Sequence, residues 1–469
     1  MPDVVCSATV KLPTHIEEEP AYSEWMATAN GELKGRRLMA PARGLLVAFF
    51  LLIATWLVLP ARPALAADWP CWRGPAHNDT TPEVSGWPRT GWPGDPAWTK
   101  DVGEGASSPI VAEGRVYVMG WQGGSDSVFG LDAKTGQELW RQSYKCPEYG
   151  RFHTGDEGAY HGVLPTPSYD AATGYLYSLS VDGDLCCWDT RSGGKRVWRM
   201  NLYDTYKVPQ RPNTGGELRD YGYTSAPLVL GDWLIVEVGA TEGNLMAFNK
   251  RTGARQWVSQ CKDPAGHTGG PAPITVNGIS CVAVLTIREL VIVRTDRGHE
   301  GETACAYDWL QQFAANVPSP TVEGDEVLLT SGLNISRTVC IRMALGGATE
   351  VWESRAFSRA CSPVVSRGCV YLAYGPLKCL DLATGETKWT GSSFGDDGSC
   401  LATGDGKLIV YGNRKLALVD IADSAAVYRE LALKPGVGSG RCWPHPVLAD
   451  GRLCVKDDMG KLYCFAVGP

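Results

Sequence analysis

The sequence predicts an all-β fold, an eight-bladed β-propeller of four-stranded blades, and three observations support this prediction. A hairpin segment that opens with Asp or Asn and reaches a Trp recurs along the chain, at residues 132–140, 189–198, 249–257 and 381–389. Between these segments, short apolar runs alternate with glycine turns. The 55 glycines and 17 tryptophans favour many short strands and turns over helices. Such repetition is typical of a closed repeat architecture.

The recurring hairpin has a local physical cause. In its first copy, Asp132 can accept hydrogen bonds from the backbone of the turn that it opens. Gly136 supplies the positive φ of a tight turn, and the strand that follows carries Trp140. We expect these tryptophans to pack between neighbouring blades and to donate their indole N–H groups.

Each repeat unit follows one plan. A short strand with small residues and proline precedes a glycine turn and a strongly apolar strand, and a third strand then runs into the Trp hairpin. The first strands of eight predicted units begin near Ser108, Thr166, Ser225, Gly270, Ser319, Ser362, Ser399 and Pro444. The fourth strands of the first seven units are expected to end in Trp140, Trp198, Trp257, Trp309, Trp352, Trp389 and Tyr428.

The eighth unit lacks its Trp strand, because the sequence after its third strand ends without one. A Trp strand without a unit lies upstream, at residues 96–100. We expect this N-terminal strand to complete the eighth blade, since closing the ring removes exposed sheet edges. The propeller is therefore predicted to span residues 98–469.

The N-terminal residues resemble a targeting signal. Residues 44–60 are apolar and uncharged, three arginines precede them, and small residues at 64–66 suit cleavage after Ala66. The apolar run is shorter than the ~20 residues of a spanning helix. We therefore expect a signal peptide at residues 39–66, a start at Met39 preceded by an extension or mis-called start at residues 1–38, and a periplasmic or otherwise exported protein. The alternative is an uncleaved anchor at residues 44–60, the chain's one contact with a membrane.

Composition narrows the partners. The formal net charge is −7 and no long basic run occurs, so nucleic acid is not an expected partner.

Only Cys6 of the 16 cysteines precedes residue 66, so an odd number follows and at least one thiol is free. Cys369 with Cys379, and Cys454 with Cys464, lie across turns and can pair or remain reduced. Residues 67–97 are rich in Trp and Pro and are expected to be irregular and to pack against the propeller.

Topology selects the candidate site residues. The first strand of each blade lines the central channel, so the residues just before these strands gather at one mouth, where a ligand is expected. This set contains Glu104, Tyr160, His161, Tyr223, His267, Asn316, Arg359, Asp397, Trp443 and His445. Two alternatives stay open: a wet mouth whose polar residues need no ligand, and a mouth plugged by residues 67–97.

The pattern Asp-x-x-Thr-Gly-x-x-x-Trp, found at residues 132–140 and 381–389, resembles the pyrroloquinoline-quinone (PQQ) repeat. The resemblance covers residues 98–469. That family includes quinoprotein alcohol dehydrogenases and also non-enzymatic propellers such as the outer-membrane protein assembly factor. It implies first an exported, non-catalytic module that binds or scaffolds an envelope protein or polymer without a cofactor. The alternative is a PQQ-dependent alcohol or sugar oxidoreductase; a carbohydrate- or peptide-processing role is a third possibility.

The oxidoreductase alternative assigns roles to mouth residues. Trp443 would be the floor under the quinone, Arg359 a cofactor contact, and Asp397 or Glu104 the catalytic base. Glu104, Asn316 and Asp397 would supply three oxygens to calcium if they converge.

The dehydrogenases also carry a vicinal disulfide against their cofactor, for which Cys186 and Cys187 are the candidates here. The repeat register places Cys187 in the small-residue position of a third strand, occupied elsewhere by Gly130, Ala247, Cys379 and Cys464. Since neighbouring strand residues point to opposite faces, we expect two buried free thiols there.

Overall fold

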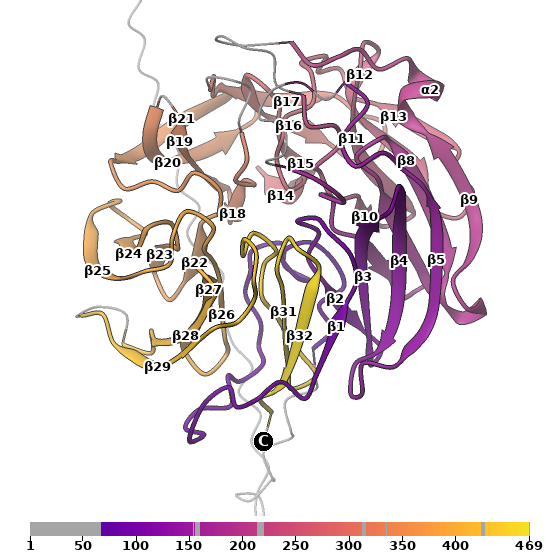
Figure 1. The fold of residues 1–469 in the computed structure, drawn as a ribbon. Helices are drawn as coiled ribbons and strands as arrows, with labels where there is room; N and C mark the ends of the chain where they lie inside the picture. Colours follow the sequence, from indigo (N-terminus) through magenta and orange to yellow (C-terminus); the bar gives the residue numbers. More distant parts are fainter. Residues whose placement is uncertain are drawn as a thin grey trace, which may run out of the picture. The chain divides into compact units, whose positions relative to one another are not determined.

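The computed structural model describes residues 67–152, 154, 160–212, 220–311, 316–333, 335–423 and 427–468. The predicted extension at residues 1–38 and signal peptide at residues 39–66 lie outside them. The described residues form eight four-stranded antiparallel sheets, arranged around a ring (Figure 1). This confirms the predicted eight-bladed β-propeller. No helix in these ranges is long and apolar enough to cross a membrane.

The strands follow the predicted repeat plan, with these bounds. The first two blades are β2 (Ile110–Ala112), β3 (Arg115–Gln122), β4 (Ser125–Asp132), β5 (Glu138–Lys145), and β6 (Ser168–Asp170), β7 (Tyr175–Leu179), β8 (Asp184–Asp189), β9 (Lys195–Asn201). The short helix α2 (Leu202–Tyr206) follows β9. The third and fourth blades are β10 (Leu228–Leu230), β11 (Trp233–Ala240), β12 (Gly243–Asn249), β13 (Arg255–Val258), and β14 (Ala272–Val276), β15 (Ile279–Leu285), β16 (Glu289–Arg294), β17 (Thr303–Asp308).

The second half of the ring repeats the same order. The fifth and sixth blades are β18 (Thr321–Glu323), β19 (Glu326–Leu333), β20 (Ile335–Ala344), β21 (Gly347–Ser354), and β22 (Val364–Ser366), β23 (Cys369–Leu372), β24 (Pro376–Asp381), β25 (Thr387–Ser393). The seventh blade is β26 (Ser399–Ala402), β27 (Lys407–Gly412), β28 (Lys415–Asp420) and β29 (Glu430–Pro435). The eighth blade takes β30 (Val447–Ala449), β31 (Arg452–Lys456) and β32 (Lys461–Ala466) from the C-terminal end.

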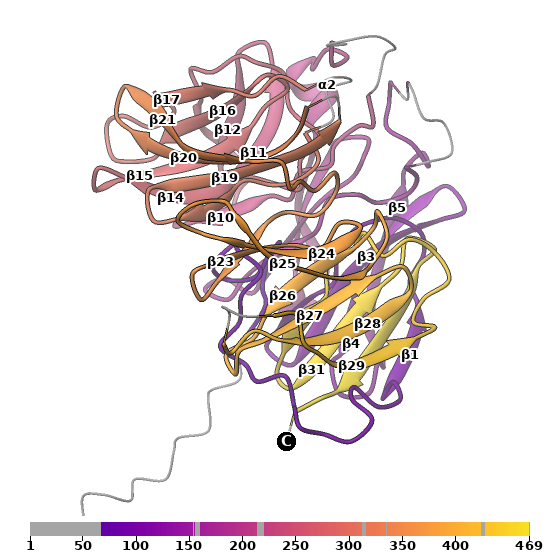
Figure 2. The ribbon, with the colours of Figure 1, turned by 90° about the vertical axis from the view of Figure 1, so that its left-hand side faces the viewer.

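The fourth strand of the eighth blade is β1 (Trp98–Asp101), from the start of the propeller. It pairs antiparallel with β32, and Trp98 lies opposite Cys464. The ring is therefore closed by the N-terminal strand, as predicted. Figure 2 shows β26 to β29 of the seventh blade beside β31 of the eighth, the blade that combines β1 with the three C-terminal strands.

The hairpin tryptophans occupy one repeated position. Each lies opposite the small-residue position of its third strand, in the pairs Trp140–Gly130, Trp198–Cys187, Trp257–Ala247, Trp352–Cys340, Trp389–Cys379 and Trp98–Cys464. A small residue is required because a Cβ on Gly130 would lie 2.4 Å from the Trp140 indole.

Two details of the predicted strands are wrong. The tryptophans lie early in the fourth strands, since β5 runs five residues beyond Trp140. In the fourth and seventh blades the position belongs to Cys305 and Ala432, while Trp309 and Tyr428 lie outside β17 and β29. Those two blades have no tryptophan at this position, so the prediction selected the nearest large ring instead.

The tryptophan indoles connect neighbouring blades. Trp98 donates its Nε1–H to the carbonyl of Ala133 at 3.0 Å. Its ring packs directly on Gly136, where an added Cβ would lie only 2.6 Å from the indole. Trp198 repeats this arrangement with the Lys250 carbonyl at 3.2 Å and Gly253. Trp352 repeats it with the Leu382 carbonyl at 2.8 Å. The predicted packing between blades is confirmed for these three tryptophans.

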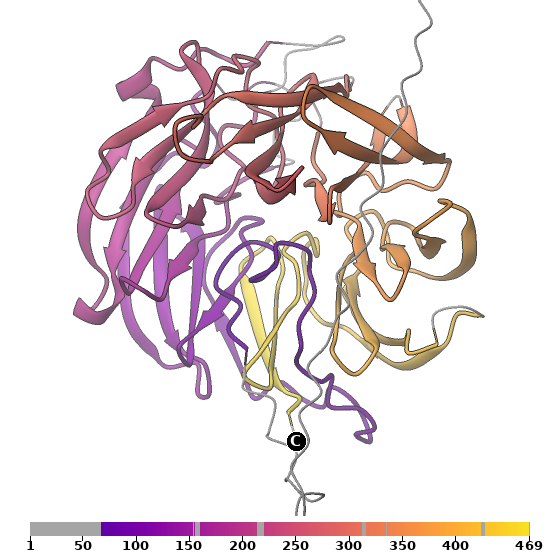
Figure 3. The ribbon, with the colours of Figure 1, turned by 180° about the vertical axis from the view of Figure 1, so that it is seen from behind.

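Residues 67–97 form no strand of their own (Figure 3). They are held by backbone hydrogen bonds to the first strands of two blades, β2 and β26. Trp69 exchanges two backbone hydrogen bonds with Val111 of β2, at 2.7 and 2.9 Å. Thr81 donates its backbone N–H to Ala402 of β26 at 2.9 Å. Because β2 and β26 belong to different blades, the segment bridges the walls of the central channel.

Arg73 is the centre of this plug, which we define as residues 69–81. Its guanidinium is buried and lies 2.5 Å from the Asp79 carboxylate. It also donates to the Thr321 hydroxyl at 2.9 Å and to the Pro363 carbonyl at 2.6 Å. A further hydrogen bond goes to the Pro320 carbonyl at 3.2 Å, so one side chain joins the plug to the fifth and sixth blades.

Candidate functional site

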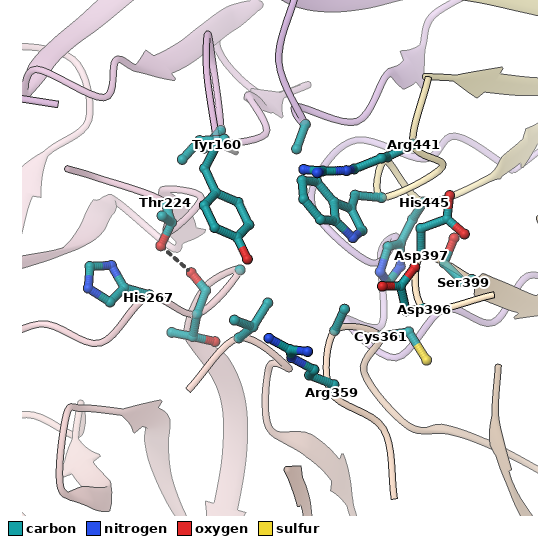
Figure 4. Close-up of a pocket in the computed structure, with 18 of the residues that line it drawn as sticks. Tyr160, Thr224, His267, Arg359, Cys361, Asp396, Asp397, Ser399, Arg441 and His445 are labelled. Atoms are coloured by element: carbon teal, nitrogen blue, oxygen red, sulfur yellow. Dashed lines mark hydrogen bonds between the residues drawn. The ribbon is translucent and has the colours of Figure 1, made fainter. Parts of the chain in front are cut away.

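A cavity of about 250 Å³ opens at the mouth formed by the loops that precede the first strands (Figure 4). We call this cavity the cup. Its wall comes from the loops before β2, β6, β10, β14, β18, β22, β26 and β30, so the topology places the site where the sequence predicts a mouth. Six of the candidate residues line the cup: Tyr160, His267, Arg359, Asp397, Trp443 and His445.

One side of the cup is an aromatic wall. The rings of Tyr160 and Trp443 are stacked at 5.2 Å with an interplanar angle of 15°. The Arg441 guanidinium lies 4.6 Å from the centre of the Trp443 ring. Tyr160 also contacts Tyr221 at 4.7 Å, and Tyr221 contacts His267 at 4.8 Å. Rings from four inter-blade loops thus form one continuous surface.

The charges of the cup are balanced. Arg359 and Arg441 approach the middle of the cavity from opposite sides (Figure 4), and Asp396 and Asp397 lie together on a third side. Among the described residues, Arg359 and Asp396 make no hydrogen bond or ion pair, and both are exposed. The cup therefore offers one cationic and one anionic side chain that protein groups leave uncompensated.

The Asp397 carboxylate binds backbone N–H groups of neighbouring loops. Its Oδ1 accepts the backbone N–H of Asn413 at 2.9 Å, and its Oδ2 accepts the backbone N–H of Cys442 at 2.8 Å. Both carboxylate oxygens of this buried side chain are therefore engaged. A general base needs an oxygen directed at the reacting proton, and this geometry uses Asp397 for positioning instead.

The plug contacts one of the residues that line the cup, His445. The His445 ring lies 4.4 Å from the Trp72 ring, and its Nδ1 lies 3.0 Å from Asp79 Oδ1. Trp72 donates its indole N–H to the Ser319 hydroxyl at 3.0 Å. Burial disfavours the charged form of Asp79, but Arg73 and His445 outweigh this effect, so the pKa of Asp79 lies below its ordinary value. The plug thus holds His445 in place, while no residue of the plug lines the cup itself.

Four candidates lie outside the cup. Tyr223 is buried and donates its hydroxyl to the Val238 carbonyl at 2.9 Å. Asn316 is buried and donates its amide to the Thr286 carbonyl at 2.7 Å. Glu104 and His161 form a separate pair at the rim, with 2.8 Å between Oε2 and Nδ1. Of the three proposed calcium ligands, only Asp397 lines the cup, because local contacts hold the other two elsewhere.

The described residues do not fit the arrangement that a quinone would need. Tyr160 and Arg441 already cover the Trp443 ring, which was the proposed floor. Cys186 and Cys187 are free, fully buried in β8 and not part of the cup. All fifteen cysteines of the described ranges are free thiols. We therefore derive no chemical step that uses PQQ.

Sequence reasoning missed several residues of the cup. Arg441, Asp396, Tyr221 and Thr224 line it beside residues that were selected. Thr224 donates its hydroxyl to the Thr268 carbonyl at 2.9 Å, which connects two of the loops (Figure 4). The topological rule took one or two positions in each loop. Extending it by two residues in either direction includes all four.

Comparisons with known proteins give relatives of two kinds. A family model described as outer membrane protein assembly factor BamB matches residues 90–162 and 125–391, more than half of the chain. BamB of Burkholderia pseudomallei (strain K96243) is 28% identical over 191 residues, which are 36% of this chain and 47% of that protein. Quinohemoprotein alcohol dehydrogenase ADH-IIG of Pseudomonas putida is 26% identical over 237 residues, 44% of this chain and 30% of that protein.

The solved structures agree on the fold. A europium-containing methanol dehydrogenase aligns with a TM-score of 0.58 at 13% identity, over 85% of this chain and 98% of that chain. At this identity the likeness concerns the fold alone. The chain spans less than half of the length of both curated relatives, one of which is named as an assembly factor and the other as an alcohol dehydrogenase.

Proposed function

This chain belongs to the family described as outer membrane protein assembly factor BamB, and on that premise we propose a non-catalytic binding module of the cell envelope. Its cup holds a segment of a partner polypeptide. Residues 39–66 act in this proposal as the signal that exports the propeller. The low identity to relatives of both kinds leaves the choice between binding and catalysis to the chemistry of the site.

The composition of the cup carries the proposal. An aromatic wall of Tyr160 and Trp443 stands beside an exposed guanidinium, Arg359, and an exposed carboxylate, Asp396. Aromatic rings bury apolar or proline side chains at low entropic cost, and flanking charges of both signs pair with the charges of a peptide. A formally neutral cup does not favour a strongly anionic cofactor over such a peptide.

The proposed catalytic carboxylates are engaged elsewhere, which also supports binding. Asp397 accepts two backbone N–H groups, and Glu104 is paired with His161 outside the cup. An oxidoreductase of the kind considered above needs one of them as a base beside its substrate. Neither has the contacts of such a base.

The experiment that tests this proposal is site-specific photo-crosslinking. The photoreactive residue p-benzoylphenylalanine replaces Tyr160 in the full chain, expressed in a bacterial envelope. The matched control carries it at Leu345, which is 45% exposed and precedes β21 in a hairpin outside the cup. We expect a polypeptide adduct at position 160 that maps to one sequence and does not form at position 345.

A synthetic peptide of the mapped sequence then measures affinity for the full chain by fluorescence anisotropy. Replacing Trp443 by Ala should lower this affinity about 10-fold or more, as is usual for a central aromatic contact. Replacing Leu345 by Ala should leave it unchanged. The same adducts at both positions, or equal peptide affinity in W443A and the parent chain, would overturn the proposal.

A further inference from the structure

We infer that Glu104, Glu148 and His161 form a binding site for a divalent transition-metal ion at the rim of the cup. Each of the three offers one ligand atom, and these atoms all lie within 4.8 Å of one another. The His161 Nδ1 and the Glu104 Oε2 are 2.8 Å apart, a spacing that two ligands of one small cation also adopt. This site is separate from the cup, whose lining contains none of the three residues.

Backbone hydrogen bonds fix the two segments that supply the ligands. Glu104 and Trp121 exchange two such bonds, both at 2.8 Å, which attach the residue to the end of β3. Gly162, the residue after His161, donates its N–H to the Glu148 carbonyl at 2.8 Å. This hydrogen bond joins the backbone beside His161 to that of Glu148. The ligand positions therefore do not depend on a free loop.

The charges of the site are incomplete without a cation. In the part of the chain that the structure describes, the Glu148 carboxylate makes no hydrogen bond or ion pair. It nevertheless lies close to the Glu104 carboxylate, and the two repel each other. An imidazole carries at most one positive charge and therefore does not compensate two carboxylates, whereas a divalent ion does.

Two further charged side chains, Lys456 and Asp458, interact with the proposed metal ligands. The Lys456 ammonium donates to the Gly105 carbonyl, and burial lowers its pKa to about 8. The Asp458 carboxylate, which interacts electrostatically with His161, accepts the backbone N–H of Arg441 at 2.7 Å. These two charges have opposite signs, so they do not cancel the attraction of two carboxylates for a cation.

The ligand set indicates the class of metal. One imidazole nitrogen and two carboxylate oxygens suit zinc and similar first-row ions, which bind both ligand types. Three protein ligands leave a fourth position for water or a group of a partner. A calcium site would take six or more oxygens and no imidazole.

Metal binding has a structural consequence for the cup. His161 follows Tyr160 directly in the chain, and Tyr160 carries the aromatic wall through its stack with Trp443. Fixing the His161 ring to a metal therefore restricts the position of the Tyr160 backbone. This consequence concerns the cup, but the metal site itself stands whether or not the cup binds a peptide.

The test is a zinc titration of the full chain, freed of metal with a chelator and then dialysed. Isothermal calorimetry with zinc chloride measures the number of bound ions in the parent chain and in Glu148→Gln and His161→Gln variants. The matched control is His299→Gln, because His299 forms a similar pair with Glu302 at 3.0 Å but belongs to no group of three ligands among the residues that the structure describes. Far-UV circular dichroism and urea midpoints verify that all variants are folded.

We expect E148Q and H161Q each to lose one equivalent of zinc that the parent chain and H299Q retain. Cobalt in place of zinc should give visible absorption bands in the parent chain that both ligand variants lack. Equal zinc stoichiometry in all four proteins would overturn the inference. Calcium binding with the same dependence on Glu148, and no zinc binding, would contradict the class of metal.

Discussion

Replacing Trp98 by Ala tests how the ring is closed. Trp98 is the residue of β1 that lies opposite Cys464 in the eighth blade and packs on Gly136 in the first. The substitution removes the indole and leaves the backbone of β1 able to pair. It therefore separates side-chain packing between the first and last blades from strand pairing itself.

The magnitude follows from the contacts. Truncating a buried Trp to Ala costs about 3–5 kcal/mol, and partial exposure of Trp98 places it near the lower end of that range. The hydrogen bond from Nε1 to the Ala133 carbonyl, at 3.0 Å, contributes about 1 kcal/mol. We expect a loss of about 3–4 kcal/mol in the free energy of unfolding, measured by urea denaturation monitored by circular dichroism.

The matched control is Trp198→Ala. Trp198 makes the same two contacts, with Gly253 and the Lys250 carbonyl, between blades that are already consecutive in the chain. Its loss should equal that of W98A within about 1 kcal/mol, because the local contacts are alike. A loss below about 1 kcal/mol for W98A, with the full loss for W198A, would refute closure of the ring through Trp98.

Two further predictions concern buried charges. Burial raises the pKa of Asp126 to about 7, so between about pH 4 and pH 7 the folded state binds more protons than the unfolded state, and this contribution to stability is lost as the pH rises. Asp126→Asn, which cannot ionise, should gain stability relative to the parent chain from pH 5 to pH 8, by up to about 4 kcal/mol; a pH-independent difference in urea titrations would contradict this. Arg73→Met leaves the Asp79 carboxylate without its closest cation and should cost about 3–5 kcal/mol, of which Arg73→Met/Asp79→Asn recovers part. Additive losses in that double-mutant cycle would show that the two side chains do not interact.

The strand register of most blades follows from short-range features of the sequence, namely the hairpin turns and the small residues opposite the tryptophans. The register that pairs Cys464 with Trp98 could be predicted because a small residue recurs opposite each hairpin tryptophan. The turn Asp132 to Gly136 sets this spacing through the Asp132 carboxylate, which accepts the backbone N–H of Thr135 at 2.8 Å. In the fourth blade that turn is absent and the position belongs to Cys305, so the prediction of Trp309 there was wrong.

The cup could be predicted only in part. Blade topology identifies the mouth, and hence Arg359 and Trp443, because the first strands have a fixed place in every blade. The plug was not predictable in detail, since Arg73 bonds to Thr321, 248 positions along the chain, and no periodic pattern marks either residue. Local sequence also gave no sign that the amides of Asn413 and Cys442 would engage Asp397.

The most direct test of the central claim is a pair of calorimetric titrations of the full chain, one with the peptide mapped by crosslinking at position 160 and one with PQQ plus calcium. We predict peptide binding that weakens in Trp443→Ala and Arg359→Ala, and no PQQ binding that depends on these residues. Micromolar PQQ binding that requires calcium and is lost in Arg359→Ala, without peptide binding, would contradict a non-catalytic binding function for the cup.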